Sequence, residues 1–440
     1  MIFIPDRRWL LVALALAALA PLALVWPATA GVMVLANGIW VLIFVVDAWW
    51  AGLVPADRLL VEQRLPPAFS VGRPLPMTLV WHNPLDRTLS MRLRLHLPPQ
   101  LARESPEGRI ALPAGGTLRQ EIPLRPLQRG RASGARIDLR IRGPWGLSWR
   151  QVAIRRPWEV TVYPRFTGAA LRSLPTQLQR RREAGLRAVR RIGEGRVFES
   201  LREWVPGEDT RTIDWKATAR RGKVMARQYE DERRQQVLIV IDAGRTLTAE
   251  SGGRPRLEAV VEAALQLAHG AIAHDDNVGL MVFADRIQQF IAPGRGRRAL
   301  RAVLDGLAGI EGRLVEPDYP LAFATLAART RRRALTVLFT DVIDRTASEA
   351  LVAHTAGLRP RHLPLAVALR DPAMDRLATV RPASSTEAFE RAAAEELLQA
   401  REEALGEMRR AGVIVLDVPP EDAGEAVVAQ YHSLKRRGVL

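Results

Sequence analysis

Two long apolar stretches near the amino terminus constrain this chain most, because neither can lie exposed in water. Residues 9–26 include no charged side chain, and residues 31–50 include only Asp47, close to the end of the stretch. A helix needs about 20 apolar residues to cross the hydrocarbon core of a membrane. Only residues 27–30 separate the two stretches, so residues 1–55 are expected to form a transmembrane helical hairpin.

Arginine residues flank this hairpin on its outer sides and are absent from its turn. Arg7 and Arg8 precede the first stretch, and Arg58 and Arg64 follow the second. Because basic residues stay on the cytoplasmic side of a membrane, both ends and all soluble domains are expected in the cytoplasm. In an alternative interpretation residues 1–30 are a cleaved signal peptide, but the second stretch would still lead the remainder to the cytoplasm.

The chain is strongly basic, with 64 Lys and Arg residues, 47 Asp and Glu residues and a formal net charge of +17. Next to a membrane such a charge favours anionic lipid as its partner, ahead of a protein partner. No nucleic acid is expected. The sequence has no cysteine, which excludes disulfide scaffolds, cysteine-ligated zinc and thiol catalysis.

The segment after the hairpin consists of short runs that alternate apolar and polar residues. Residues 77–81 and 91–97 are examples, and Pro, Gly and Asn residues separate such runs. This pattern is typical of half-buried antiparallel strands. It predicts an immunoglobulin-like β-sandwich over residues 56–166. The next segment, residues 167–236, begins with an arginine-rich linker at residues 171–191.

The last part of the chain, residues 237–440, alternates apolar runs with helical patterns. Its five runs are residues 237–242, 278–283, 335–340, 364–369 and 413–418. Continuous apolar strands separated by helices indicate a parallel sheet that is covered on both faces. An α/β domain is therefore expected here, with residues 286–291 as an antiparallel edge strand.

A dense block of charged and aromatic residues, 195–230, precedes this domain. Its spacing lets Arg211 reach Asp214 along a helix, which favours an ion-pair clasp that docks onto the sheet. The alternatives are a surface that docks a partner and a catalytic carboxylate. Asp209 is expected to cap a short helix that ends near Gly222, and Trp215 to be a buried anchor. The candidate interaction residues are Arg202, Pro206, Gly207, Asp209, Arg211, Asp214, Trp215, Arg220 and Glu230.

The order of residues in this block resembles the signature of a bacterial family known only as domain of unknown function 58. The matching positions include Gly195, Phe198, Leu201, Arg202, Trp204, Pro206, Gly207, Asp209, Arg211, Ile213, Asp214, Trp215, Ala219 and Arg220. The resemblance implies that a Rossmann-like von Willebrand factor A domain follows the block, and that the protein lies in the bacterial inner (plasma) membrane. It also implies a partner, since such proteins are commonly associated with AAA+ ATPases of the MoxR type.

The same resemblance implies a candidate metal site. In von Willebrand A domains a divalent cation is held by an Asp-x-Ser-x-Ser loop, a later Thr and an Asp that follows the fourth strand. By this comparison Asp242, Thr246 and Asp341 would ligate Mg²⁺, a cation that prefers hard oxygen ligands. The site is degenerate, because Gly244 replaces the middle hydroxyl and Arg245 adds a positive charge. A metal-free interaction surface is the alternative.

The sequence lacks several enzyme signatures, namely a phosphate-binding Gly-x-x-x-x-Gly-Lys-Ser/Thr loop, a HExxH pattern and a Gly-x-Ser-x-Gly elbow. We therefore expect no enzyme, but a membrane-anchored adaptor that works with the ATPase in assembly or chaperone-like processes. One alternative is a metal-dependent hydrolase centred on Asp242, Asp318 and Asp341. Another is a structural envelope protein whose sandwich and arginine-rich linker bind anionic lipid.

Overall fold

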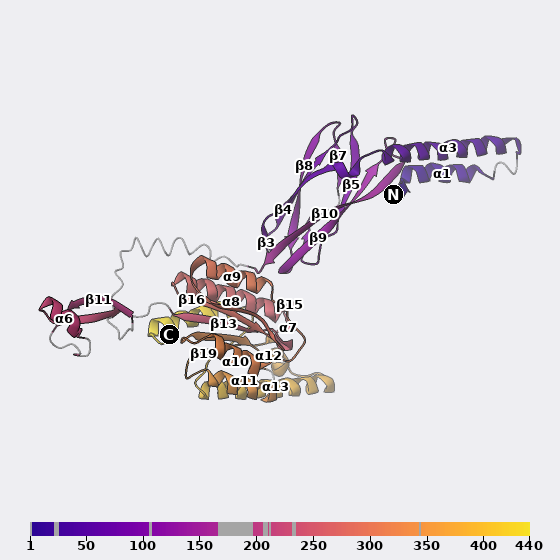
Figure 1. Cartoon of the computed structure of the whole chain (residues 1–440). Coiled ribbons are helices and arrows are strands. Elements are labelled where there is room, and N and C mark those ends of the chain that lie inside the picture. Colours follow the sequence, from indigo (N-terminus) through magenta and orange to yellow (C-terminus); the bar gives the residue numbers. More distant parts are fainter. Residues whose placement is uncertain are drawn as a thin grey trace. The chain divides into compact units, whose positions relative to one another are not determined.

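The computed structural model describes residues 2–21, 26–104, 108–165, 197–205, 210, 213–230, 235–342 and 345–440. The chain divides into two compact units, Met1–Arg165 and Phe166–Leu440 (Figure 1). The first unit combines two apolar helices with mostly antiparallel strands, and the second is built around a mostly parallel sheet with helices. The α/β character expected from the sequence is therefore confirmed.

Two helices form the amino-terminal part of the first unit, after the short strand β1 (Ile2–Pro5). Among the described helices, only α3 (Ala28–Gly52) is long and apolar enough to cross a membrane, over Thr29–Gly52. Helix α1 (Arg7–Leu19) has 13 residues and ends before residue 26, where the first apolar stretch was expected to end; residues 22–25 lie outside the described part. The two helices are in contact, because the Trp9 and Trp40 rings stack with their centroids 6.4 Å apart.

The remainder of the first unit is a β-sandwich. One sheet has the order β1-β10-β9-β5-β7, with β3 also paired to β10, and the other has the order β2-β4-β8-β6. The strands are β2 (Leu60–Arg64), β3 (Ala68–Ser70), β4 (Leu75–His82), β5 (Leu89–Leu95), β6 (Leu101–Arg103), β7 (Arg109–Leu112), β8 (Thr117–Pro126), β9 (Gly130–Arg142) and β10 (Ser148–Tyr163). Alternate residues of these strands enter one shared core, as Leu79 of β4 and Leu93 of β5 do.

The signature block forms a separate two-stranded sheet. Strands β11 (Val197–Glu203) and β12 (Met225–Glu230) pair in antiparallel fashion, and helix α6 (Trp215–Arg221) lies between them in the chain. Asp214 caps this helix, since its Oδ1 atom accepts 3.0 Å hydrogen bonds from the backbone nitrogens of Lys216 and Ala217. Gly222 ends the helix in the left-handed conformation (φ 67°), as predicted.

The large sheet of the second unit has the order β17-β16-β13-β18-β19-β20. Its strands are β13 (Gln236–Asp242), β16 (Asn277–Phe283), β17 (Ile287–Gly294), β18 (Leu335–Thr340), β19 (Leu363–Leu369) and β20 (Ile414–Val418). All neighbours are parallel except β17, which pairs antiparallel with β16 at the edge. The parallel sheet and its antiparallel edge strand both match the sequence prediction.

Helices cover both faces of this sheet, so alternate side chains of each central strand enter two different cores. Val237 and Ile239 face the core formed with α8 (Arg256–Ala273), α9 (Gly296–Ala308) and α14 (Ala423–Arg437). Leu238 and Val240 face the core formed with α10 (Tyr319–Arg329), α11 (Arg345–Gly357) and α13 (Ser385–Arg410). Burial on both faces explains why the strands read as continuous apolar runs. Shorter elements of this unit are α7 (Arg245–Thr248), β14 (Glu250–Ser251), β15 (Arg254–Pro255) and α12 (Pro372–Thr379).

Candidate functional site

The two aspartates predicted at the strand ends lie on neighbouring strands. Asp242 is the last residue of β13, Asp341 directly follows β18, and β13 pairs in parallel with β18. The chain continues from β13 to β16 on one side and reaches β18 on the other, so the strand order reverses at this position. In open α/β sheets, ligands bind outside the carboxyl ends of the strands at such a reversal.

Asp242 is completely buried, with 0% of its surface exposed. Its Oδ1 atom accepts a hydrogen bond from the backbone nitrogen of Gly244 (2.9 Å), and its Oδ2 atom accepts bonds from the hydroxyls of Tyr319 (2.8 Å) and Thr340 (3.0 Å). Burial raises the pKa of Asp242 because the charged form loses its hydration, although these three donors act in the opposite direction. Burial and the nearby Asp242 also raise the pKa of Tyr319, which therefore stays a hydrogen-bond donor.

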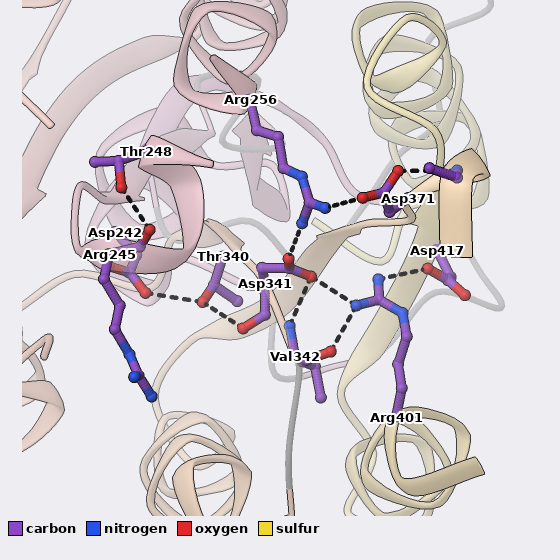
Figure 2. A network of polar contacts seen from close by, with 11 residues as sticks. Asp242, Arg245, Thr248, Arg256, Thr340, Asp341, Val342, Asp371, Arg401 and Asp417 are labelled. Atoms are coloured by element: carbon purple, nitrogen blue, oxygen red, sulfur yellow. Dashed lines mark hydrogen bonds and ion pairs between the residues drawn. The ribbon is translucent and has the colours of Figure 1, made fainter. Parts of the chain in front are cut away.

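Asp341 is 5% exposed and is held by two guanidinium groups (Figure 2). Its Oδ1 atom accepts hydrogen bonds from Arg401 Nη1 (2.6 Å) and from the backbone nitrogen of Val342 (2.9 Å). Its Oδ2 atom forms an ion pair with Arg256 Nη1. The two arginines approach from opposite sides of the sheet, because Arg256 begins α8 and Arg401 lies in α13.

Two further carboxylates complete this group, which we call the buried arginine cluster: Asp341, Arg256, Arg401, Asp371 and Asp417. Arg256 Nη2 pairs with Asp371, and Arg401 Nη2 pairs with Asp417 at 2.8 Å (Figure 2). Burial alone would lower the pKa of Arg401, but the charges of Asp341 and Asp417 outweigh it and raise that pKa. The cluster joins α8, β18, the start of α12, α13 and β20 through charged groups.

The arrangement does not fit the Mg²⁺ site expected from Asp242, Thr246 and Asp341. Asp341 is already paired with two guanidinium groups, and both oxygens of Asp242 accept hydrogen bonds from the protein. Thr246 fits best, because its buried hydroxyl has no hydrogen-bond partner in the described part of the chain. Within the described residues, no three or more His, Asp or Glu side chains lie together as metal ligands would.

Two acidic residues just before α10 also have roles other than metal binding. Asp318 caps α10, with its Oδ1 atom 2.8 Å from the backbone nitrogen of Leu321. Glu316 forms a 2.7 Å ion pair with Arg245, and both side chains are more than half exposed. A second ion pair, between Arg313 and Asp285, lies at the same carboxyl edge, since Asp285 follows β16. Two ion pairs therefore lie at the carboxyl ends of the strands, and we call their four residues, Arg245, Glu316, Arg313 and Asp285, the charged rim.

The candidate residues of the signature block are described only in part. Asp214 caps α6, the task assigned to Asp209, and Arg220 is exposed on the same helix. The prediction that Trp215 is a buried anchor is wrong, since 69% of this residue is exposed. Arg202 lies in β11 and Glu230 in β12, but their side chains are outside the described part. Four further candidates lie outside the described part of the chain, namely Pro206, Gly207, Asp209 and Arg211. The expected pair of Arg211 with Asp214 therefore lies outside it too.

Residues 200–415, just under half of the chain, match the model of a family described as "Protein of unknown function DUF58". No curated protein matches the chain.

Several solved structures are distantly similar to the chain. An aerotolerance-related membrane protein from Bacteroides fragilis is 15% identical over 46% of this chain and 99% of its own, with a TM-score of 0.32. The conserved hypothetical protein BatB from Bacteroides thetaiotaomicron has the same identity and coverage and a TM-score of 0.33. For alpha-2-macroglobulin of Escherichia coli the identity is 23%, the TM-score is 0.20, and the match covers 24% of this chain and only 7% of that one. Such scores carry no assignment of activity.

Proposed function

We propose that this chain is a membrane-anchored, non-enzymatic adaptor that presents the charged rim of its parallel sheet to a protein partner. The observation that carries the proposal is the state of the two strand-end aspartates. Asp242 is fully buried under Tyr319 and Thr340, and Asp341 is neutralised by Arg256 and Arg401. A general acid or base must come within hydrogen-bond reach of its substrate, so neither carboxylate is suited to the hydrolase alternative.

The anchor in this proposal is a two-span hairpin with both ends on the cytoplasmic side of the bacterial inner membrane. Strand pairing supports the location of the ends on one side, because β1 precedes the helices and pairs with β10, which follows them. The same pairing argues against a signal peptide cleaved after Ala30. Such cleavage would remove β1 and also Asp6, which accepts a 2.6 Å hydrogen bond from Trp149 Nε1.

The partner in this proposal is an AAA+ ATPase of the MoxR type, in keeping with the family that the sequence resembles. The ATPase would supply the nucleotide hydrolysis for which this chain has no phosphate-binding loop. The rim offers charges of both signs, from the exposed Arg245, Glu316 and Asp285 and the partly exposed Arg313, which suits recognition of a partner surface of complementary charge. Anionic lipid and a protein partner, rather than nucleic acid, remain the expected contacts of the basic chain.

The test compares two charge reversals in the full-length chain, purified in mild detergent through an affinity tag. Arg245→Glu reverses an exposed charge on the rim, where it is paired with Glu316. Arg332→Glu is the matched control. Arg332 is exposed and precedes β18, so it lies near the amino ends of the parallel strands, away from the rim. We expect mass spectrometry to detect an AAA+ ATPase with the wild type and the control but not with Arg245→Glu. Equal recovery with both variants would contradict docking at the rim.

Replacing the buried aspartates is a weaker test of docking. Asp242→Ala would leave Tyr319 and Thr340 without their acceptor, and a loss of partner could then follow from damage to the fold.

A further inference from the structure

The end of the β-sandwich that receives the two apolar helices is held to them without a linker. Asp47, near the end of α3, is completely buried, and its carboxylate accepts bonds from the turn between β9 and β10. The donors are the backbone nitrogens of Trp145 (2.7 Å), Leu147 (3.1 Å) and Ser148 (2.8 Å), and the Ser148 hydroxyl (2.7 Å). Gly143 leaves the necessary space, because a Cβ atom there would collide with this carboxylate.

Carbonyl groups at the end of α3 are also satisfied by the sandwich. Arg150 Nη1 donates to the carbonyls of Ala51 (3.2 Å), Gly52 (2.9 Å) and Val54 (2.6 Å). The last carbonyls of a helix lack intrahelical partners and normally bind water or a cap. Here a sandwich residue supplies the cap, so the sandwich begins where the apolar helix ends.

Large apolar side chains are exposed around this junction. They come from β1, from the end of α3 and from the turn between β9 and β10. Trp145 of the turn is 53% exposed and stacks on Trp50 of α3, with ring centroids 6.3 Å apart. The others are Ile2, Phe3, Trp49 and Leu53. Tryptophan side chains concentrate at the boundary between lipid and water, where one part of the ring system is apolar and the N–H group is polar.

An apolar groove of about 530 Å³ runs along the same region. One face of α3 lines it, from Phe44 through Ala48 to Leu53, and Phe3 of β1 lines it as well. The groove therefore extends the apolar surface of a candidate membrane helix onto a strand of the sandwich. An acyl chain is the occupant that matches this continuity, because the helix face beside it would itself be covered by acyl chains.

Arginine side chains accompany the aromatic residues at this end. Arg87 donates to the Trp50 carbonyl (3.1 Å) and lies over the Trp50 ring, 5.7 Å from its centroid. Arg7 and Arg8 are exposed at the start of α1. Cations beside an aromatic belt match the phosphate layer of a membrane, since long basic side chains extend toward the headgroups.

We infer that this end of the β-sandwich is a lipid-binding surface, seated in the headgroup layer, with a phospholipid acyl chain in the groove beside Phe3. The inference rests on the membrane anchor of the proposed function but goes beyond it, because it assigns residues of the soluble sandwich to the membrane.

The absence of cysteine from the chain allows a direct test with single cysteine variants and spin labels. The full-length chain is reconstituted in vesicles of phosphatidylethanolamine and phosphatidylglycerol, and collisions of each label with oxygen and with a water-soluble nickel complex are measured. Trp145→Cys reports on the inferred surface. Leu127→Cys is the matched control, since Leu127 is also half exposed but precedes β9, whose 13 residues span roughly 40 Å between the two positions. Leu42→Cys reports on the exposed face of α3.

We expect the label at position 145 to collide with oxygen more, and with nickel less, than the label at position 127. Equal nickel accessibility at 145 and 127, with position 42 protected by lipid, would refute the lipid-binding surface while leaving the anchor intact. Nickel accessibility at position 42 as well would overturn the anchor itself. Protection of position 145 from both reagents would indicate a protein contact and would also overturn the inference.

Discussion

Replacement of Arg401 by leucine is the sharpest test of the buried arginine cluster. Arg401 makes three hydrogen bonds, to Asp341 Oδ1 (2.6 Å), the Val342 carbonyl (2.6 Å) and Asp417 Oδ1 (2.8 Å). The removal of one partner from a buried ion pair destabilises a protein by about 3–5 kcal/mol. Asp341 keeps Arg256 in this variant, and Asp417 is partly exposed and can be rehydrated, so we expect the lower limit, about 3 kcal/mol.

Amide hydrogen exchange on the full-length chain measures this loss locally, which suits a protein with two compact units. Because about 1.4 kcal/mol corresponds to a factor of ten, protected amides of β18 and of the carboxyl-terminal half of α13 should exchange roughly 100-fold faster in Arg401→Leu. Arg401→Lys should recover part of the protection, because an ammonium group keeps the charge but cannot bridge two carboxylates as the planar guanidinium does.

Arg410→Leu is the matched control on the same helix. Arg410 is largely exposed, and its ion pair with Glu407 is long, at 4.0 Å. Its loss should therefore change the exchange rates by roughly twofold or less. The reasoning is refuted if Arg401→Leu exchanges as slowly as the wild type. It is also refuted if Arg410→Leu accelerates exchange as much as Arg401→Leu does, since the effect would then belong to the helix and not to the buried charges.

Three further predictions concern pH, metal and the signature block. The pKa of Asp242 is raised in the folded state, so its contribution to stability is complete below the ordinary value of 3.8 and is lost as pH rises through the folded pKa. The midpoint of thermal unfolding should therefore fall less with rising pH in Asp242→Asn than in the wild type. The midpoint of thermal unfolding should not change with EDTA or with added Mg²⁺, because Asp341 already binds two guanidinium groups. Asp214→Ala should destabilise α6 by about 1 kcal/mol, whereas Trp215→Ala should change its stability by less than about 0.5 kcal/mol, both measured by exchange of the α6 amides.

Each of these predictions has an outcome that contradicts it. An equal pH dependence in the wild type and Asp242→Asn would exclude Asp242 as the titrating group. A rise in the unfolding midpoint with Mg²⁺ that Asp341→Asn abolishes would restore the metal site. A larger effect of Trp215→Ala than of Asp214→Ala would mean that Trp215 is covered in solution.

The large sheet could be predicted from the sequence because a strand that is buried on both faces appears as a run of consecutive apolar residues. Val237, Leu238, Ile239 and Val240 are buried alternately against two helical layers, so all four must be apolar. The antiparallel edge strand β17 was predictable for a related reason, since its residues are only partly buried and include polar side chains.

Of the candidate site, only the two aspartates at the strand ends could be predicted from the sequence. Asp242 and Asp341 are recognisable because each ends an apolar run, but the partners of Asp341 lie 85 and 60 residues away in two helices. One feature of the sequence indicates that Arg401 is unusual. It shares a helical face with the buried residues Ala404, Leu405 and Met408, where a charged side chain requires a partner. The spacing cannot identify that partner, because register between distant elements is not encoded locally.

The block and the helix junction show the same limit. Trp215 is aromatic in a dense block, which favours burial, yet α6 is a short helix with only Ala217 buried. Asp47 stood out as the one charge in an apolar stretch, but the turn that satisfies it lies about 100 residues later. Local pattern identifies such a residue as unusual, and only the tertiary fold explains it.

The pairing of β1 with β10 has a consequence for biogenesis. Ile2 lies opposite Gln151, so the first strand of the sandwich is synthesised almost 150 residues before the strand that it needs. At about 5–20 residues per second, translation would separate the two by roughly 7 to 30 s, and both apolar helices leave the ribosome in that interval. The residues that donate hydrogen bonds to Asp47 are synthesised about 100 residues after it, so Asp47 has no such donors for most of the same period. In the proposed membrane anchor, the two helices would therefore enter the bilayer before their cap exists, and completion of the sandwich would then fix helices that are already inserted.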